Sequence, residues 1–504
     1  MYNDESRVKS SLKNTGFTVV GQLIKELMAF VVRTVFIKTL AVEYLGVNGL
    51  FTNILSFLSL AEMGVGSALI FSMYKPVANH DEKKIQIYMG VYKRVYRWIG
   101  IGVLIVGFSL TPFLNYFIKD HPDIPKLELI YVLYVINTAA TYFFAYKGSI
   151  FNADQRAYIV TNNTTVFTVI QSLARIVVLL LTHDFVLYLI VSVIVVYVQN
   201  IIIAVKADKQ YPFIQEKCKE HLSQEESEKL KKNIGALMLH RVGSVVLNSS
   251  DNLIISKFVG LVSVGLYSNY SLITNAIKTA FNLVMGAVTP SIGNLCAQES
   301  KAKIEQVHDA ILLMNTWIIA FCSIALYELL NPFVMLWLGS EYLLSAGVVL
   351  TLVISFYVQC TMRTNEMFKT GAGLFWKDRY APIAQCVINI VVSIALSIRY
   401  DIAGIFLGTT IAMLTTKFWV GPYILYRDLF NKSVVKYFIH YAKYTLIGIV
   451  GAFFAHIINS FLPTSGILSF ITKMCVCTLI PNSVFLLATF RTSEFRYIRK
   501  LIKR

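Results

Sequence analysis

The sequence has few charged residues for its length, and this scarcity excludes most soluble folds. Only 15% of the 504 residues are Asp, Glu, Lys or Arg, whereas 56% are hydrophobic. Soluble domains carry about 25% charged and about 45–50% apolar residues. Apolar runs of roughly 20 residues, the length that crosses a bilayer as a helix, recur along nearly the whole chain. We therefore expect an all-α integral membrane protein.

The motifs of soluble enzymes and of metal sites are also missing. No Walker A, dinucleotide-binding, nucleophile-elbow or HExxH pattern stands in a suitable context. The seven cysteines are scattered, and the eight histidines show no metal-ligand spacing. The first apolar run is too long and too charged for a cleavable signal peptide. Because the loops between apolar runs are also too short for a catalytic domain, we predict neither an enzyme nor a bound metal or cofactor.

The apolar runs predict about 14 transmembrane helices. Their approximate ranges are 16–40, 48–73, 98–118, 129–150, 158–181, 184–205, 234–257, 265–290, 310–330, 344–366, 380–399, 402–425, 438–460 and 467–489. An even number of spans places both ends of the chain on the same side of the membrane.

The distribution of Lys and Arg predicts which side that is, because positive residues stay cytoplasmic. One set of loops and ends holds 33 of the 46 Lys and Arg, and the opposite set holds 5. We therefore expect a multi-pass protein of the cell membrane with both termini in the cytoplasm. The same asymmetry accounts for the net charge of +17, so membrane lipids rather than nucleic acid are the expected partners.

A shift of 219 residues aligns the two halves of the chain. It pairs Lys38 with Lys257, Gly46 with Gly265, Ala78 with Ala297, Lys84 with Lys303 and Ile85 with Ile304. We expect two pseudo-symmetric six-helix bundles at 1–205 and 233–430. The cytoplasmic linker 206–232 contains a capping-box signal at 223–226 and is expected to form a surface helix. Residues 431–504 add two transmembrane helices and a basic cytoplasmic tail. Transporters built from parallel repeats bind substrate between the repeats.

Charged residues inside the predicted spans mark the candidate site, since each costs about 2.5–3.5 kcal/mol at the bilayer centre. Polar residues on one face of the eighth span accompany them. We expect a substrate cavity lined by Lys25, Arg33, Arg241, Lys278, Ser271, Asn275 and Asn282. The acidic residues Glu26, Glu62 and Asp251 either neutralise these cations or bind a coupling ion, H⁺ or Na⁺. Ion pairs that stabilise the bundle are the alternative interpretation of all these charges.

Five other charged residues in the spans are expected to be structural. Arg175, Lys417 and Lys473 lie within a turn or two of a span end, from which a long side chain reaches the interface. Arg363 and Glu366 are spaced for a pair within one helix.

The second span resembles that of a known family. Tyr44-Leu45-Gly46-Val47-Asn48-Gly49-Leu50-Phe51 and Leu60-Ala61-Glu62-Met63-Gly64-Val65-Gly66-Ser67-Ala68 are similar to the polysaccharide transporters, the Wzx-type flippases of lipid-linked oligosaccharides. That family belongs to the multidrug/oligosaccharidyl-lipid/polysaccharide exporter superfamily. The resemblance extends to the predicted spans, the charged linker and the charged first span.

The resemblance implies two bundles around a cationic cavity lined mainly by the first, second, seventh and eighth spans. The matching positions are Lys25, Arg33, Glu62, Arg241, Asp251 and Lys278. It also implies translocation of an undecaprenyl-diphosphate-linked glycan by alternating access, with a polysaccharide polymerase and assembly proteins as partners. A cation-coupled multidrug or small-molecule exporter of the same superfamily is the alternative.

Overall fold

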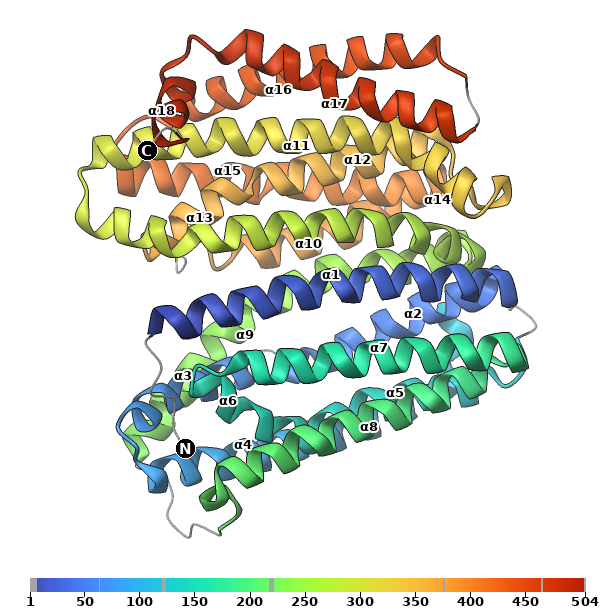
Figure 1. Cartoon of the computed structure of the whole chain (residues 1–504), viewed down its shortest axis with the longest axis vertical. Coiled ribbons are helices and arrows are strands. Elements are labelled where there is room, and N and C mark those ends of the chain that lie inside the picture. Colours follow the sequence, from blue (N-terminus) through green and yellow to red (C-terminus); the bar gives the residue numbers. More distant parts are fainter. Residues whose placement is uncertain are drawn as a thin grey trace. The chain divides into compact units, whose positions relative to one another are not determined.

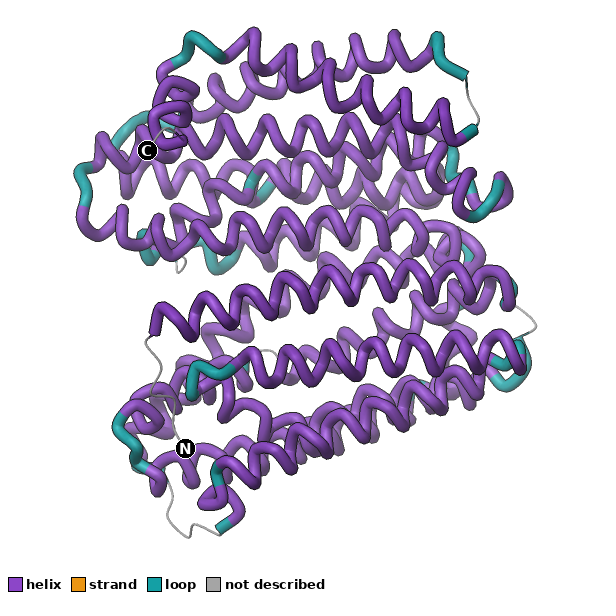
Figure 2. Tube along the Cα trace, in the orientation of Figure 1, coloured by secondary structure: helices purple, strands orange, loops and turns teal. Residues whose placement is uncertain are grey.

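The computed structural model describes residues 7–62, 64–119, 124–216, 222–374, 377–463 and 466–502. These residues form helices and their connections, and no strand occurs among them (Figures 1 and 2). The prediction of an all-α protein is therefore confirmed. Contacts group the chain into two compact units, Met1–Gly265 and Leu266–Arg504.

The first unit is a bundle in which long helices pack lengthwise. It contains α1 (Arg7–Thr39), α2 (Val42–Leu58), α3 (Val65–Ala78), α4 (Glu82–Ser109), α5 (Leu127–Ala145), α6 (Ser149–Ala153), α7 (Ala157–Thr182), α8 (Phe185–Gln210) and α9 (Gln224–Ile254). Helix α1 packs along α7, α5 contacts both α4 and α8, and α9 packs against α2 and α3.

The second unit contains most of α10 (Leu261–Gln298) and all later helices. These are α11 (Lys301–Trp337), α12 (Ala346–Thr361), α13 (Arg363–Gly371), α14 (Ala381–Thr415), α15 (Lys417–Ile424), α16 (Val435–Ser460), α17 (Ile467–Thr489) and α18 (Ser493–Ile502). Helix α11 contacts α12, α16 and α17, so the last two long helices are anchored on it.

The described residues contain nine helical segments long and apolar enough to cross a membrane, or ten if the bent segment 82–117 is included. One of the nine, Ala381–Phe430, contains two predicted spans, because Asp401 breaks it with a φ of 48°. The predicted first, second and seventh spans are too polar or too interrupted to be counted. These are the spans that hold most of the charged residues predicted to line a cavity, and the number fourteen stays a prediction.

The predicted second span, 48–73, is wrong as a single helix. Helix α2 ends at Leu58, a 3₁₀ turn covers Ser59–Glu62, and Gly64 has a φ of 107° that favours glycine. Helix α3 then begins at Val65, and its second residue, Gly66, has no side chain. A Cβ atom there would lie 2.6 Å from the Tyr96 hydroxyl oxygen. The break places Glu62 at an interruption in the middle of the bundle.

The capping box predicted at 223–226 is present, but it begins a different helix from the one expected. The Ser223 side chain accepts from the Glu226 backbone N–H, and the Glu226 side chain accepts from the Ser223 backbone N–H. This box starts α9 itself, which continues without interruption into the predicted seventh span. Lys84 on α4 pairs with Glu226 at 2.9 Å and holds the pKa of that half-buried carboxyl below its usual value.

Two glycines that the 219-residue shift pairs lie at one close helix crossing, while the repeat itself stays a prediction. A Cβ atom on Gly46 would lie 2.3 Å from the Leu261 carbonyl oxygen, and one on Gly265 would lie 2.6 Å from the Val42 carbonyl oxygen. The two contacts are reciprocal, because the shift relates Val42 to Leu261 as well as Gly46 to Gly265. Only glycine permits this approach of two backbones.

Helix starts repeat in the same register, although the offset later changes by one. Asp81 caps α4 by accepting from the Lys84 N–H, and Ser300, 219 residues on, caps α11 by accepting from the Lys303 N–H. Further along, α7 ends at His183 with φ 54°, and α14 breaks at Asp401 with φ 48°. These breaks are 218 residues apart, so the repeats differ by one residue before this point.

Candidate functional site

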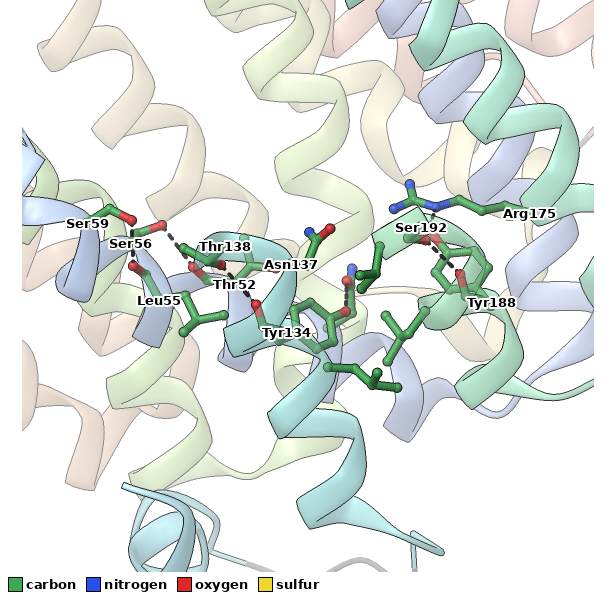
Figure 3. A pocket seen from close by; sticks show the side chains of 14 residues that line it. Thr52, Leu55, Ser56, Ser59, Tyr134, Asn137, Thr138, Arg175, Tyr188 and Ser192 are labelled. Carbon is green, nitrogen blue, oxygen red and sulfur yellow. Dashed lines mark hydrogen bonds between the residues drawn. The ribbon is translucent and has the colours of Figure 1, made fainter. Parts of the chain in front are cut away.

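A polar pocket lies inside the first unit, among α2, α5, α7 and α8 (Figure 3). Its volume is ≈ 400 Å³. Amides, hydroxyls, two tyrosines and one guanidinium form its polar lining, and no lining residue is acidic. These residues are Asn48, Thr52, Ser56, Ser59, Tyr134, Asn137, Thr138, Arg175, Tyr188 and Ser192.

The lining of α2 explains why the pocket is polar on that side. Asn48, Thr52, Ser56 and Ser59 recur every three or four residues, so they share one face of the helix. Across the pocket, the Tyr134 hydroxyl of α5 donates to Asn48 Oδ1. Thr138 follows one turn later on the same face of α5 and donates to the Tyr134 carbonyl. Two helices thus present hydrogen-bonding groups to a common space.

Arg175 supplies the positive charge of the pocket, which corrects the prediction that it reaches the membrane interface. Its Nε donates to the Ser192 hydroxyl at 2.6 Å, and its guanidinium lies 4.8 Å from the centre of the Tyr188 ring. Ser192 in turn donates to the Tyr188 carbonyl at 2.7 Å. In Figure 3 the side chain extends from α7 over these two α8 residues. The position of Arg175 near a helix end did not predict that its side chain contacts residues of α8.

Arg33 of α1 lies near the same pocket. It interacts electrostatically with Tyr134 and Tyr188, both of which line the pocket. The predicted cavity residue Arg33 and the unexpected residue Arg175 therefore share two aromatic neighbours. The structure thus brings two cations of the first unit toward one polar space.

Glu62 lies outside the pocket lining, at the break between α2 and α3. The Tyr96 hydroxyl donates to Glu62 Oε1 at 2.6 Å, and Tyr142 lies within hydrogen-bonding reach of both Glu62 and Ser59. Ser59 also lines the pocket, so Tyr142 links the carboxylate of Glu62 to a lining residue. In the described part of the chain, Glu62 forms no ion pair with a basic side chain.

The other charged residues predicted in the first unit are spread along its helices. Lys25 and Glu26 are half-buried on α1, and Glu26 accepts from the Gln22 side chain at 2.8 Å. Asp251 is half-buried near the end of α9. The side chain of Arg241, also on α9, lies outside the described residues.

The predicted polar stripe on α10 is only partly buried in the second unit. Ser271 and Lys278 are half-buried, whereas Asn275 and Asn282 are exposed. The Lys278 ammonium lies 5.9 Å from the centre of the Phe356 ring on α12. The intrahelical pair of Arg363 and Glu366 is confirmed at 3.3 Å. A single cavity shared by both repeats stays a prediction.

The pocket was not found from the sequence, although part of its signal was there. Gln171 and Arg175 are one helical turn apart on α7, and both donate to Ser192, Gln171 to its carbonyl at 3.0 Å. A polar pair at this spacing in an apolar helix indicates a polar neighbour. The partner residue on α8 cannot be identified from spacing alone, because it depends on how the two helices are rotated.

Solved structures with the same fold are membrane transporters. A lipid II flippase MurJ in an inward closed conformation matches with a TM-score of 0.68 and 11% identity, over 96% of this chain and 99% of that chain. An inward-facing multidrug resistance MATE family transporter of the MOP superfamily matches with a TM-score of 0.60 and 14% identity, over 80% of this chain and 97% of that chain. A Vibrio cholerae MATE transporter matches with a TM-score of 0.53 and 15% identity, over 84% of this chain and 99% of that chain. At these identities the likeness shows the fold.

Sequence comparison gives the family. No curated protein sequence matches the chain. A family model described as polysaccharide biosynthesis protein matches residues 11–296, which is more than half of the sequence. The resemblance of the second span to polysaccharide transporters is thereby confirmed. This chain belongs to the polysaccharide biosynthesis protein family, and it is a multi-pass membrane protein with the transporter fold of MurJ and the MATE transporters.

Proposed function

We propose that this chain is a flippase that moves an undecaprenyl-diphosphate-linked oligosaccharide across the cytoplasmic membrane by alternating access, for cell-surface polysaccharide biosynthesis. The observation that carries this proposal is the pocket of the first unit, which offers amides, hydroxyls and a guanidinium but no carboxylate. Such a lining can replace the water around sugar hydroxyls, whose burial without partners is costly.

The cations and polar residues predicted from the sequence have roles in this scheme. Arg33 and Arg241 would bind diphosphate oxygens with their planar forks, and Lys25 and Lys278 would add point charges. The polar stripe of α10, Ser271, Asn275 and Asn282, would contact the glycan. The polyprenyl chain would stay in the hydrocarbon of the bilayer, so none of its apolar surface would be transferred into water.

Glu62 is the best-placed of the three acidic residues proposed for coupling to H⁺ or Na⁺. It sits at a helix break and shares the neighbour Tyr142 with Ser59, a residue of the pocket lining. Glu26 is engaged by Gln22 on its own helix, and Asp251 lies toward the far end of α9. Binding of a cation at Glu62 would change its hydrogen bond with Tyr96 and so bias the angle between α2 and α3.

The same carboxylate supports a second candidate, a cation-coupled exporter of drugs or other small molecules. Under that proposal Glu62 would exchange a coupling ion for a cationic substrate, and the pocket would hold an uncharged part of that substrate. We rank this second because a lining without carboxylates, with a guanidinium, disfavours cationic compounds.

Orientation and partners complete the proposal. The excess of Lys and Arg in one set of loops supports an orientation with both termini in the cytoplasm. The oligosaccharide would then be delivered to the outer face, where a polysaccharide polymerase and assembly proteins would use it. Membrane lipids surround the bundle, and no step requires nucleic acid.

The test is a double replacement, Arg33→Ala with Arg241→Ala, in cells whose surface polysaccharide depends on this chain. We expect the polysaccharide to disappear and its lipid-linked precursor to accumulate on the cytoplasmic side. The control exchanges two exposed arginines, Arg399→Ala with Arg499→Ala, and should keep wild-type levels. Normal polysaccharide in the first variant, at equal protein abundance, contradicts the flippase. Normal polysaccharide in both Arg33→Ala with Arg241→Ala and Glu62→Gln cells, with increased sensitivity to cationic drugs in the Glu62→Gln cells, identifies the exporter instead.

A further inference from the structure

Arg175 is held in place by its Nε and by its ring neighbour, which leaves the outer edge of its guanidinium available. The Nε donates to Ser192, and the Tyr188 ring covers one side of the group. Among the described residues, no acceptor is found for its two terminal nitrogens, and the pocket lining holds no carboxylate. Two parallel N–H groups at the edge of a guanidinium match the two oxygens of a carboxylate or phosphate. This edge faces the space of the pocket (Figure 3).

The remaining lining is suited to a sugar ring. The hydroxyls of Ser56, Ser59 and Thr138 donate to carbonyls of their own helices, so their oxygens are left to accept hydrogen bonds. The Oδ1 atom of Asn137 is buried and has no hydrogen-bond partner. A ligand rich in hydroxyl donors would satisfy these acceptors, and sugar hydroxyls are such donors.

The charge of the lining distinguishes between kinds of anion. Arg175 is the one charged residue that lines the pocket, so the lining carries a single positive charge. A carboxylate carries one negative charge and is neutralised by one guanidinium. A diphosphate carries more and would enter this low-dielectric space incompletely compensated. Arg33, which interacts with Tyr134 and Tyr188, adds to the field but is not part of the lining.

We propose that the terminal nitrogens of Arg175 bind the carboxylate of an acidic sugar, such as a hexuronic acid, within the translocated glycan. The sugar hydroxyls then donate to Asn137 and to the hydroxyl oxygens of α2 and α5. This inference rests on the proposed function, because it names the class of oligosaccharide that the flippase accepts. The diphosphate of the lipid carrier binds elsewhere.

The experiment measures ligand binding to the purified full chain in lipid nanodiscs, without transport. Saturation-transfer NMR titrations compare methyl β-glucuronide with methyl β-glucoside, which differ in the carboxylate. Inorganic pyrophosphate is added as a competitor. The variants are Arg175→Gln, Arg175→Lys and the exposed control Arg399→Gln.

We expect wild type and Arg399→Gln to bind the glucuronide at least about tenfold more tightly than the glucoside, as a charge-assisted pair of hydrogen bonds provides. Arg175→Gln should lose this preference while still binding the glucoside. Arg175→Lys should keep part of it, because the charge remains and the fork is lost. Its intermediate value shows that the pocket is still folded.

Equal affinity for the two glycosides in wild type overturns the inference, and so does a preference that persists in Arg175→Gln. Displacement of the glucuronide by equimolar pyrophosphate also overturns it, in favour of a phosphate site. The proposed function has a separate readout. Accumulation of lipid-linked precursor in the Arg33→Ala, Arg241→Ala cells without any glucuronide preference refutes the acidic sugar alone. A clear preference in a chain that does not affect the polysaccharide refutes the flippase alone.

Discussion

The two repeats differ most where their internal helices meet. In the first unit, Arg175 and Tyr188 line an open polar pocket. With the offset of 218 given by the breaks at His183 and Asp401, their counterparts are Ser393 and Phe406. Ser393 is buried against Gly408, and a Cβ atom on that glycine would lie 2.4 Å from the Ser393 hydroxyl oxygen. The second repeat is thus closed at the place where the first is open.

An aromatic pair stands at two of the corresponding positions in the second unit. Tyr267, which the 219 shift relates to Asn48 of the pocket, lies 5.0 Å from Phe406 between ring centres. An amide and a tyrosine that face a pocket in the first repeat are replaced by two rings in contact. The two repeats therefore differ at these positions, with a polar pocket in the first and a ring contact in the second. Four predictions test this contrast, in decreasing order of expected effect.

Transferring the arginine to the closed repeat should be the most damaging change. Ser393→Arg would place a long cation against Gly408, where there is no room for it. An unpaired charge buried in this way lowers the free energy of unfolding by roughly 3–5 kcal/mol. We expect the variant to be absent from the membrane fraction. The converse variant, Arg175→Ser, should accumulate normally, because it removes a group from an existing space. Equal abundance of the two variants would show that the repeats are not different in packing.

The glycine crossing is a place where the repeats should behave alike. Gly46→Ala and Gly265→Ala each force a methyl group against a carbonyl oxygen, at 2.3 and 2.6 Å. We expect each to lower the free energy of unfolding by about 1–3 kcal/mol. Gly90→Ala and Gly286→Ala, where nothing lies within 4 Å, should be neutral or slightly stabilising. Thermal unfolding in detergent measures all four, and a large effect at only one crossing glycine would refute the reciprocal contact.

Glu62 has no acidic counterpart, since the 219 shift relates it to the buried Phe281. Coupling through a carboxylate would therefore belong to the first repeat. Glu62→Gln should fold normally, because its amide oxygen still accepts from Tyr96, but transport should no longer depend on pH or Na⁺. Tyr96→Phe removes the donor and should cost about 1–3 kcal/mol of stability. Unchanged ion dependence in Glu62→Gln would exclude this residue from coupling.

The smallest effect is expected at Lys278, which the shift relates to Ser59 of the pocket. Its contact with the Phe356 ring at 5.9 Å is worth about 0.5–1 kcal/mol. Lys278→Ser should therefore change the unfolding temperature by only a few degrees and reduce polysaccharide less than Arg33→Ala does. Loss of folding in this variant would mean that Lys278 belongs to the packing of the second unit and not to a cavity.

Much of the fold could be predicted, because periodicity and composition act locally. The apolar runs identified each long helix, and Ser223 with Glu226 identified the start of α9. The break at Ser59–Glu62 was missed, because the apolar run continues through it and the close approach of Gly66 to the Tyr96 hydroxyl is made across the bundle. The surface helix expected in the linker became part of α9 for a similar reason, since packing on α2 and α3 extends that helix.

The site was predicted less well than the fold. Mid-membrane charge singled out Arg33, which interacts with two tyrosines of the pocket, and Glu62, which accepts from Tyr96, and their roles in binding and coupling stay predictions. The same reasoning set Arg175 aside because it lies near a span end, although its partners Ser192 and Tyr188 hold it inside the pocket. Which face of α7 meets α8 depends on tertiary packing, and one sequence carries little information about it.

The most direct test of the central claim is a translocation assay in proteoliposomes. Undecaprenyl-diphosphate-linked oligosaccharide is placed in the membrane, and its arrival on the other side is followed with an impermeant glycan-modifying enzyme. We expect the purified chain to translocate it. The Arg175→Ser variant, reconstituted at equal density, should be at least about tenfold slower, because it loses a charge-assisted pair of hydrogen bonds to the substrate. Translocation no faster than in protein-free vesicles, or an Arg175→Ser rate equal to wild type, would contradict the account.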